Sequence, residues 1–545
     1  MSGRSPGHRA TPKSTSTSSV LLAAVAGAVA GAVGIAASEL LAGIVSGAPS
    51  LVVAVGSLII ALQPPGAKDV VVGLFGTNDK TVVNVAVVAV ALVVATAAGI
   101  LGRRNFNNAL GLLLAFGLVA FAAAALQPLS SPGLAALNAT IAMGVAIGAL
   151  RILLGEAGFM APVRFARPGS LRADDSTITP AATRSPSEPQ LSRRRFLLRS
   201  VGFLIGAVAV GVFGRLLLDR QHAGGVPVSA KLPVASEAAP SLTAAESLAA
   251  PGITPIVMPN DRFYRIDTEL LVPQVDASTW QLKVTGMVEH PLAYTYADLL
   301  AMPLFEQYVT LACVSNEVGG NLVGNTLWTG VHLKKILADA GVKSGATQIV
   351  GRSLDGFTVG FPTAWALDPA REPMIAVGMD HAPLPTEHGY PARLIVPGLF
   401  GYVSSTKWLS EIELTTREAF DGYWVPLGWA KDGPIVTESR IDNPSDGSNL
   451  SAGPADIDGV AWAPDRGVDR VEIRIDNGPW QTALLSSPIS KATWVQWQMR
   501  WQATPGSHTI EVRATDGNGA VQTATQHAPS PSGATGYDHV KVSVT

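Results

Sequence analysis

Long apolar runs dominate the N-terminal part of the chain, and short alternating patterns dominate the rest. A helix needs about 17–25 mostly apolar residues to cross the hydrocarbon core of a bilayer. One run, Leu40–Leu62, is ambiguous because it contains Ser46, Pro49 and Ser57. The positive charges described below require an odd number of crossings before Thr81, so we predict a re-entrant or interfacial segment there, or part of one long tilted helix. Five other runs predict membrane-spanning helices: Val20–Ala37, Thr81–Leu101, Asn108–Leu126, Leu134–Leu154 and Phe196–Leu218.

The segment from about residue 259 to residue 416 combines strand and helix signals. Apolar and polar side chains alternate in Trp280–Val284, which is typical of a strand with one buried face. Thr295 and Asp298 have the spacing of a capping box, the pattern that opens a helix. Val331–Ala340 predicts a short helix that ends at Gly341. We therefore expect an α+β domain here.

After residue 444 the pattern becomes one of short strands. Val471–Ile475, Val495–Trp501 and Ile510–Ala514 each alternate, and Asn477 with Gly478 supplies a turn. These features predict an immunoglobulin-like β-sandwich, whose aromatic stripe should lie in the core rather than form a ligand platform. The predicted fold is therefore multi-domain: an all-α transmembrane bundle, an α+β domain and a β-sandwich.

The distribution of positive charge predicts the orientation of the helices. The net charge is -2, with 39 Lys and Arg against 41 Asp and Glu, so the totals do not indicate nucleic-acid binding. Lys and Arg near a membrane mark its cytoplasmic side. They gather in the tail 1–19, at Arg103 and Arg104, and in the Arg/Ser/Pro-rich linker 156–195. We place these segments in the cytoplasm, so the last span carries the chain out of it.

That last span has an unusual preface, Ser192–Arg199, in which three arginines are followed by Phe-Leu. It resembles the twin-arginine export signal, which precedes a weakly apolar segment and serves proteins that cross the membrane folded. Its position inside the chain departs from the usual N-terminal one. The alternative is a simple cluster of charges that anchors the helix on the inside.

These signals divide the chain into consecutive segments. The boundaries we expect are a cytoplasmic tail 1–19, a transmembrane bundle 20–155, a cytoplasmic linker 156–195, a final transmembrane helix 196–218, a linker 219–254, an α+β domain 255–434 and a β-sandwich 435–545.

Cysteine and histidine usage limits the cofactors. Cys313 is the single cysteine, so neither a cysteine-held iron–sulfur cluster nor a c-type haem is expected. All nine histidines lie outside the predicted spans, which leaves a membrane haem b without two imidazole ligands. A lone cysteine is commonly a small buried apolar residue, but the residues around Cys313 indicate a different role. Glu39, beside the first span, is expected to be a helix-end residue rather than a proton relay.

The neighbours of Cys313 form a specific motif. The run Leu311–Gly320 contains Cys-Val-Ser-Asn, and Leu327–Val331 contains Trp-Thr-Gly-Val. His388–Leu394, Val396–Gly401 and Lys407–Leu409 follow downstream. This order resembles the sulfite oxidase family, in which one cysteine thiolate binds molybdenum held by a molybdopterin. The resemblance covers about half of the chain, and the β-sandwich matches that family's dimerisation domain, which implies a homodimer as one expectation.

The resemblance implies roles for individual residues. A soft thiolate suits a high-valent metal already held by the pterin's two sulfurs, so Cys313 is the expected metal ligand. The resemblance implies Cys313 and Arg265 as the catalytic residues. Basic and hydroxyl side chains suit the pterin phosphate. The alternative for Arg265 and Arg393 is a surface or interdomain ion pair. The alternative for His388 is an ordinary loop residue. The cofactor-binding residues that the family implies are Asn260, Tyr264, Arg265, Cys313, Ser353, His388, Arg393, Ser405, Thr406 and Lys407.

One position departs from the family. Sulfite oxidases carry an arginine five residues after the cysteine, where it helps bind the anionic substrate, but this chain has Val318 there, next to Glu317. We therefore doubt sulfite as the substrate. The motif also resembles, more loosely, a bacterial periplasmic methionine-sulfoxide reductase. No haem domain of the kind fused to animal sulfite oxidases is present in the sequence.

The expected function follows from these residues. We expect a multi-pass membrane protein whose extracytoplasmic domain catalyses two-electron oxygen-atom transfer at molybdenum. Its partners would be a small oxo donor or acceptor and a separate electron carrier, either the quinone pool or a cytochrome. The rival hypothesis is a non-catalytic envelope protein used for adhesion or assembly, which would have lost its pterin-binding residues, whereas Cys313, Arg393 and Lys407 are all present.

Overall fold

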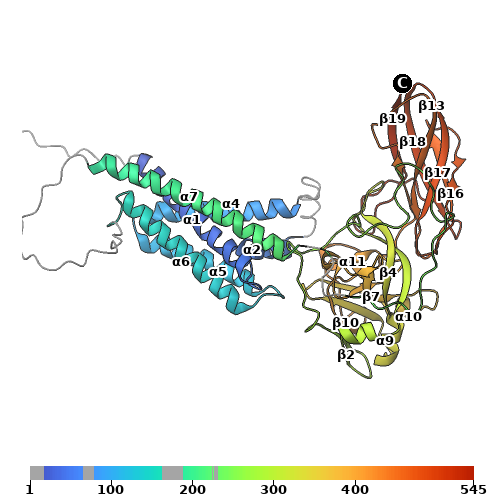
Figure 1. Cartoon of the computed structure of the whole chain (residues 1–545), viewed down its shortest axis with the longest axis horizontal. Helices are drawn as coiled ribbons and strands as arrows, with labels where there is room; N and C mark the ends of the chain where they lie inside the picture. Colours follow the sequence, from blue (N-terminus) through green and yellow to red (C-terminus); the bar gives the residue numbers. More distant parts are fainter. Residues whose placement is uncertain (1–16, 65–78, 162–187, 224, 226–230) are drawn as a thin grey trace, which may run out of the picture. The chain divides into compact units, whose positions relative to one another are not determined.

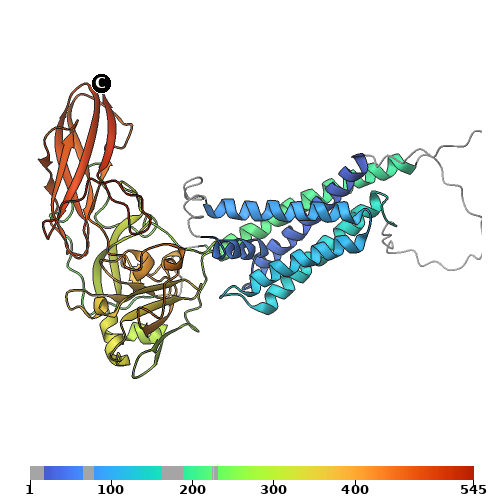
Figure 2. The ribbon, with the colours of Figure 1, turned by 180° about the vertical axis from the view of Figure 1, so that it is seen from behind.

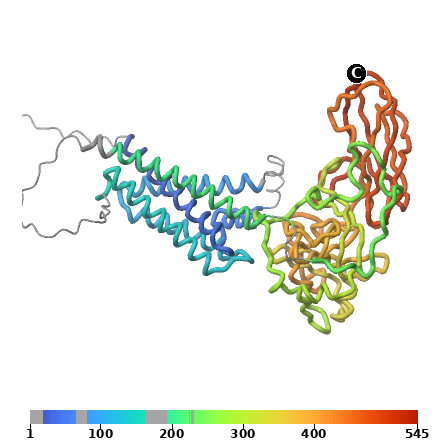
Figure 3. The backbone as a smooth tube through the Cα atoms, in the orientation of Figure 1, coloured from blue at the N-terminus to red at the C-terminus, as the bar shows by residue number. Residues whose placement is uncertain are grey.

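The computed structural model describes residues 17–64, 79–161, 188–223, 225 and 231–545. The chain divides into a helical unit, which extends to residue 223, and a mainly β unit from residue 224 onward. Figures 1 and 2 show the two units from opposite sides, and Figure 3 traces the backbone. Most of the expected tail 1–19 and of the arginine-rich linker 156–195, on which the predicted orientation depends, lies outside the described residues.

The helical unit consists of long apolar helices that run side by side (Figure 1). Within the described residues, five of them are long and apolar enough to cross a membrane, as the hydrophobic pattern predicted. Alanine and leucine side chains fill their contacts, among them Ala26, Leu150 and Leu153. The helices are α1 (Thr17–Ile44), α2 (Leu51–Ala61), α4 (Asp79–Gly102), α5 (Phe106–Ala125), α6 (Pro132–Glu156) and α7 (Glu188–Gln221).

The ambiguous run Leu40–Leu62 is divided between two helices. Its first residues continue α1 to Ile44, and Leu51–Ala61 forms α2, whose N-cap Ser50 accepts a hydrogen bond from the backbone N–H of Val53. At about 1.5 Å per residue, the eleven residues of α2 span far less than the roughly 30 Å of a hydrocarbon core. Length alone therefore argues against α2 as a sixth span.

Glu39 of α1 is buried inside the bundle rather than exposed at its end. Its carboxylate accepts a hydrogen bond of 2.5 Å from the hydroxyl of Ser50 and lies 3.9 Å from the guanidinium of Arg215 on α7. Asn138 of α6 donates to the backbone carbonyls of Ser38 and Pro49. These polar contacts join α1, α6 and α7 where α2 begins.

The second unit begins with an α+β domain built on two sheets. In the first sheet the strand order is β2-β1-β10-β5-β6, and in the second it is β3-β4-β7-β8, with β9 paired to β7. The elements are β1 (Gln281–Gly286), β2 (Leu292–Thr295), α8 (Tyr296–Ala301), β3 (Phe305–Ala312), β4 (Val323–His332), α9 (Leu333–Ala340), β5 (Gln348–Ser353), β6 (Thr358–Pro362), α10 (Thr363–Leu367), β7 (Met374–Met379), β8 (Ala382–Pro383), β9 (Arg393–Ile395), α11 (Gly401–Ser404) and β10 (Leu409–Thr415).

Most local predictions for this domain are confirmed. The capping box of Thr295 and Asp298 starts α8, and Gly341 ends α9 in a left-handed conformation with φ of 66°. The predicted start of α9 at Val331 is wrong by two residues. Val331 and His332 are the last residues of β4, because they pair with Ile375 and Met374 of β7. Tertiary pairing overrides the helical pattern at this point.

The C-terminal domain is the predicted β-sandwich. Its two sheets have the orders β11-β13-β17-β16 and β12-β19-β18-β14-β15. Trp497 is fully buried between them, and Trp501 is half-buried at the edge, so the aromatic stripe does belong to the core. The strands are β11 (Glu438–Asn443), β12 (Asn449–Leu450), β13 (Gly453–Trp462), β14 (Val468–Ile475), β15 (Gln481–Thr482), β16 (Leu484–Leu485), β17 (Val495–Ala503), β18 (Gly506–Asp516) and β19 (Asp538–Val544).

Residues 231–256, most of which we expected to be a linker, form an extended strap along the second unit. Its backbone bonds first to the α+β domain, where Ser236 donates to the carbonyl of Leu304. It then bonds to the sandwich, where the side chain of Gln496 accepts from Leu248 and donates to the carbonyl of Thr254. The strap therefore connects the α+β domain to the sandwich.

Candidate cofactor site

Cys313 lies at the start of a tight loop after β3. Its backbone N–H donates to the carbonyl of Leu322 (2.9 Å), which closes the loop at its base. Its half-buried sulfur is 2.9 Å from the hydroxyl of Ser315, so the thiol already has one polar neighbour. Asn316 is buried, and its side-chain oxygen accepts from the N–H of Leu322 at 2.8 Å. Residues 313–322 (hereafter the cysteine loop) thus hold one partly exposed thiol.

Two buried cations stand close together in the same domain. The Nε of Arg393 donates to the hydroxyl of Ser405 (2.9 Å), and its Nη1 donates to the carbonyl of His388 (3.2 Å). Burial lowers the pKa of Arg393 to about 10, and burial also lowers the pKa of Lys407 to about 8. A buried cation is costly unless an anion compensates it. These two side chains therefore favour a negatively charged ligand.

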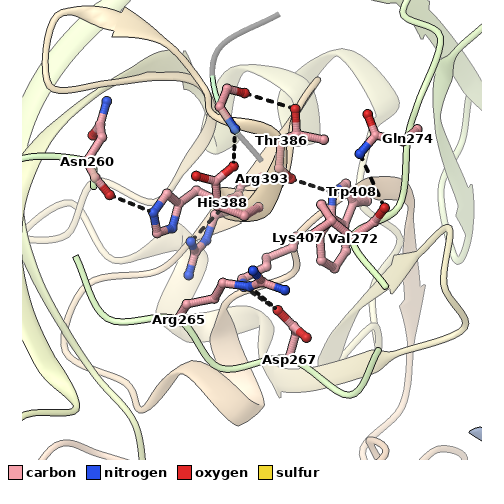
Figure 4. A network of polar contacts seen from close by, with 12 residues as sticks. Asn260, Arg265, Asp267, Val272, Gln274, Thr386, His388, Arg393, Lys407 and Trp408 are labelled. Atoms are coloured by element: carbon pink, nitrogen blue, oxygen red, sulfur yellow. Dashed lines mark hydrogen bonds and ion pairs between the residues drawn. The ribbon is translucent and has the colours of Figure 1, made fainter. Parts of the chain in front are cut away.

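Asp267 supplies only part of that compensation. One of its carboxylate oxygens accepts from both Lys407 (3.2 Å) and Arg265 (3.1 Å), as Figure 4 shows. The side chain of Arg265 is 40% exposed, whereas that of Asp267 is 4% exposed. Nearby Asp355 has its pKa raised by burial. Lys407 and Arg265 thus share a single carboxylate oxygen of Asp267.

His388 and Asn260 present two buried acceptors. The Nε2 of His388 donates to the backbone carbonyl of Asn260 (3.0 Å), which leaves its Nδ1 as a lone-pair acceptor. Within the described residues, neither this Nδ1 nor the side-chain oxygen of Asn260 has a hydrogen-bond partner. Burial, assisted by Lys407 and Arg393, lowers the pKa of His388 to about 3, so the ring is neutral. Buried acceptors without donors call for a ligand or water that donates to them.

Aromatic side chains form the wall beside these acceptors. Phe263 stacks on Tyr264 and meets the rings of Trp328 and His388 edge to face. Arg393 lies over the ring of Trp328, 5.2 Å from its centroid. Burial raises the pKa of Tyr264, and the negative charge of a Cys313 thiolate raises it further. Tyr264 therefore lies near both Cys313 and Arg393.

The geometry favours a ligand contact less for two other predicted residues, Thr406 and Ser353. The hydroxyl of Thr406 is buried without a hydrogen bond, but a Cβ added at Gly351 would lie 2.5 Å from it, so it points into the sheet. Its backbone N–H and carbonyl both pair with Leu394. The buried hydroxyl of Ser353 accepts from the N–H of Asp355. The geometry lends no support to a ligand contact of Thr406 and little to one of Ser353.

The sequence analysis missed two residues of this site. Asp267 follows Arg265 by two positions, so the two could have been suspected as a local pair, but its bond to Lys407 joins residues 140 apart in sequence. Ser315 was part of the motif but received no role. No described group of three or more His, Cys, Asp or Glu side chains could hold a metal on its own. A metal here would need further ligands from a cofactor.

The observed donors and acceptors fit a molybdopterin. Its phosphate would meet Arg393, Lys407 and Arg265, and its ring donors would meet the acceptors of His388 and Asn260. The thiol of Cys313 would remain free for the metal. Of the predicted set, the contacts above join Asn260, Arg265, His388, Arg393, Ser405 and Lys407 into one region, with Tyr264 linking it to Cys313.

Known proteins share these domains. Residues 269–424 match the family described as an oxidoreductase molybdopterin binding domain, and residues 438–512 match a bacterial Ig domain. Mitochondrial sulfite oxidase of Homo sapiens is 29% identical over 301 residues, which cover 47% of this chain and 55% of that protein. Nitrate reductase [NADH] 1 of Oryza sativa subsp. japonica is 27% identical over 310 residues, which cover 45% of this chain and 34% of that protein. The chain thus spans about half of these relatives or less.

Solved structures are similar as well. Among them is the sulfane dehydrogenase SoxCD from Paracoccus pantotrophus, at 25% identity and a TM-score of 0.43. The similarity covers 47% of this chain and 72% of that one.

Proposed function

Since residues 269–424 form a sulfite-oxidase-like molybdopterin-binding oxidoreductase domain, we propose that the protein is a membrane-anchored molybdenum enzyme that transfers an oxygen atom to or from a small molecule. The observation that carries this proposal is the pairing of buried cations with buried, unpartnered acceptors beside a free thiol. A purely apolar core would not contain buried cations, and a satisfied polar network would not contain buried acceptors without donors. A cofactor with a phosphate and ring donors accounts for it.

The residues have separate roles in this proposal. Arg393, already fixed by Ser405 and by the carbonyl of His388, binds the cofactor's anionic end with little loss of side-chain entropy. Lys407 and Arg265 exchange part of their bond to Asp267 for the same phosphate. Cys313 supplies one thiolate to the metal. The bound molybdenum would supply the two-electron chemistry.

We further propose that the substrate is not sulfite. A small dianion near the metal needs charge-assisted donors, and Val318 stands where sulfite oxidases have an arginine. Arg265, whose side chain is partly exposed, could replace part of that charge. A neutral S-oxide or N-oxide does not need this donor. The electrons would be exchanged with a separate carrier, the quinone pool or a cytochrome.

The side of the membrane is also a proposal. Positive charge before the first span and in the linker 156–195 supports cytoplasmic placement of both. The helix α7 would then carry the chain outward, and residues 225–545 would work outside the cytoplasm. The twin-arginine-like preface at Arg193–Arg195 supports export of this part in a folded, cofactor-loaded state. A homodimer through the sandwich belongs to the same proposal.

Metal analysis of the purified full chain tests the central claim. We expect about one molybdenum per chain in the wild type, and loss of oxygen-atom transfer in Cys313→Ser with the fold kept. Arg393→Met should lose cofactor and metal together. Arg417→Gln, which removes a half-exposed arginine paired with Asp432 in the same domain, should keep both. A wild-type protein without molybdenum, or a fully active Cys313→Ser variant, would overturn the proposal.

A further inference from the structure

One face of β11 lies against the cysteine loop. Side chains in a strand alternate between its two faces, so Glu438, Arg440 and Asp442 point the same way. Ile441, between them, packs into the core of the sandwich. The three charged residues contact the α+β domain and the strap instead, as their hydrogen bonds show. The first strand of the sandwich thus has a polar face that is buried between domains.

Arg440 uses each of its nitrogens for a different partner. Its Nη1 donates to the backbone carbonyl of Gly320 in the cysteine loop (2.9 Å). Its Nη2 donates to the hydroxyl of Thr254 in the strap (2.8 Å), and its Nε donates to Asp442 (2.7 Å). Asp442 in turn accepts from the N–H of Thr254 (3.0 Å). We call Arg440, Asp442 and Thr254 the arginine clamp.

Two further sandwich residues touch the same loop. The carboxylate of Glu438 lies 3.5 Å from the side-chain nitrogen of Asn316, whose oxygen holds the N–H of Leu322. Gly319 has φ of +75°, and a Cβ added there would lie 2.5 Å from the carboxylate of Asp538. Asp538 is itself fixed by the N–H of Ile441 (2.8 Å). The loop therefore lies against the sandwich at Asn316, Gly319 and Gly320.

The loop also has bonds of its own near the cysteine: the backbone N–H of Asn316 donates to the carbonyl of Cys313 (3.0 Å), and the side chain of Asn316 accepts from Leu322. Cys313 and Leu322 close its base, and Gly320 donates to the carbonyl of Glu317. The carbonyl of Gly320 is held by Arg440 from the other domain. A planar guanidinium with several donors can bind a carbonyl, a hydroxyl and a carboxylate at once, which a lysine cannot do. Loss of the clamp would release the loop opposite the thiol.

We propose that Arg440 is a positioning residue for Cys313, so that the β-sandwich completes the cofactor site through the cysteine loop. The consequence for metal binding rests on the proposed function, but the effect on the thiol does not. Arg440 touches neither the thiol nor the cations of the site in the contacts described above. It acts by limiting how often the loop opens.

The single cysteine makes the test specific. We would measure the rate at which iodoacetamide alkylates Cys313 in the detergent-solubilised, cofactor-free full chain. Removing a charge-assisted hydrogen bond should speed alkylation by about tenfold in Arg440→Gln, since opening of the loop becomes easier. Arg500→Gln is the matched control, because Arg500 belongs to the same sandwich but its side chain is 85% exposed. Its rate should equal that of the wild type.

A second variant keeps the test decisive if Arg440→Gln does not fold. Thr254→Val removes one partner of Arg440 with almost no change in shape, and it should speed alkylation by a smaller factor. Wild-type rates in folded Arg440→Gln, or in Thr254→Val where Arg440→Gln does not fold, would overturn the proposal. An equal rise in Arg500→Gln would do the same. Because this readout needs no molybdenum, it separates failure of the clamp from failure of the proposed function.

Discussion

At the residue scale, burial determines the chemistry of the candidate site. His388 is held neutral because burial and two nearby cations oppose its protonation. Its Nε2 is committed to the carbonyl of Asn260, so only Nδ1 can serve a ligand, and only as an acceptor. The same cations are kept in place by hydroxyl, carbonyl and carboxylate groups of the chain. The site is therefore prepared for an anion with donors beside it.

The low pKa of His388 predicts a pH dependence of stability. A histidine whose pKa is lowered in the folded state binds fewer protons than in the unfolded state between pH 6.5 and about 3. Its contribution to stability is present above pH 6.5 and is lost on acidification through that range. The apparent Tm of the cofactor-free chain should fall less between pH 7 and pH 4.5 in His388→Gln than in the wild type. Equal falls would contradict a neutral His388.

Val318 predicts the substrate preference. Each charge-assisted hydrogen bond contributes roughly 1.5–3 kcal/mol. Its absence should weaken transition-state binding of sulfite by about ten- to a hundredfold, at about 1.4 kcal/mol per factor of ten. We expect poor sulfite turnover in the wild type, a gain in Val318→Arg, and better turnover of neutral S-oxides or N-oxides by the wild type. Steady-state assays with artificial electron carriers decide this. Efficient wild-type sulfite oxidation with a low KM would contradict it.

At the scale of elements, the sequence predicted what depends on local pattern. The spans follow from the length of apolar runs, and the capping box of Thr295 and Asp298 and the sandwich strands follow from spacing and alternation. The two-residue error at Val331 arose because strand pairing between distant segments decides where β4 ends. The strap was mistaken for a linker for the same reason, since its Ala- and Ser-rich composition does not reveal its partners.

In the candidate site, too, the sequence predicted the local features and not the long-range contacts. The motif around Cys313, together with Arg393 and Lys407, could be recognised because each lies in a characteristic run of neighbours. The shared carboxylate of Asp267 and the arginine clamp could not, since they join residues more than a hundred positions apart. Charged residues occupy every second position of β11, as they can in a surface strand, although Glu438 and Arg440 are buried. Long-range pairing determines these features.

The preface of α7 makes a prediction about export. The side chains of α7 are described from Arg193 onward, and those of Arg193, Arg194 and Arg195 are exposed. Replacing Arg193 and Arg194 with lysine keeps the charge that anchors a helix on the inside, but it removes the guanidinium groups that an export receptor recognises. We expect the first four spans to insert and residues 225–545 to stay protected from external protease. The matched control is Arg103→Lys with Arg104→Lys. Normal exposure in the first variant would support the simple anchor.

At the scale of the whole molecule, the second unit is one assembly of two domains. The interface between them buries carboxylates as well as Arg440. Burial raises the pKa of Glu438 to about 8, against a hydrogen bond from Asn316 that lowers it, while Asp538 raises it further. At neutral pH Glu438 is therefore mostly protonated, next to the cysteine loop. Packing of the sandwich against the α+β domain is thus linked to proton binding by Glu438.

The raised pKa of Glu438 predicts the direction in which stability changes with pH. Because the folded-state pKa of Glu438 is raised, its contribution to stability is present below pH 4.5 and is lost as pH rises to about 8. Glu438→Gln should reduce the loss of stability between pH 5 and pH 8, by at most about 1.4 kcal/mol per pH unit. The measurement is the apparent Tm of the solubilised chain across this range. A variant with the same pH profile as the wild type would show that Glu438 is ionised in the fold.

The strap has a consequence for synthesis. The backbone carbonyls of Thr254 and Ile256 accept hydrogen bonds from the side chains of Gln496 and Trp494, residues made some 240 positions later. A ribosome that has produced the α+β domain has therefore not yet produced what holds its first segment in place. The second unit can reach its final state only near the end of translation. A route that moves finished proteins suits such a chain better than one that threads it through a pore as it emerges.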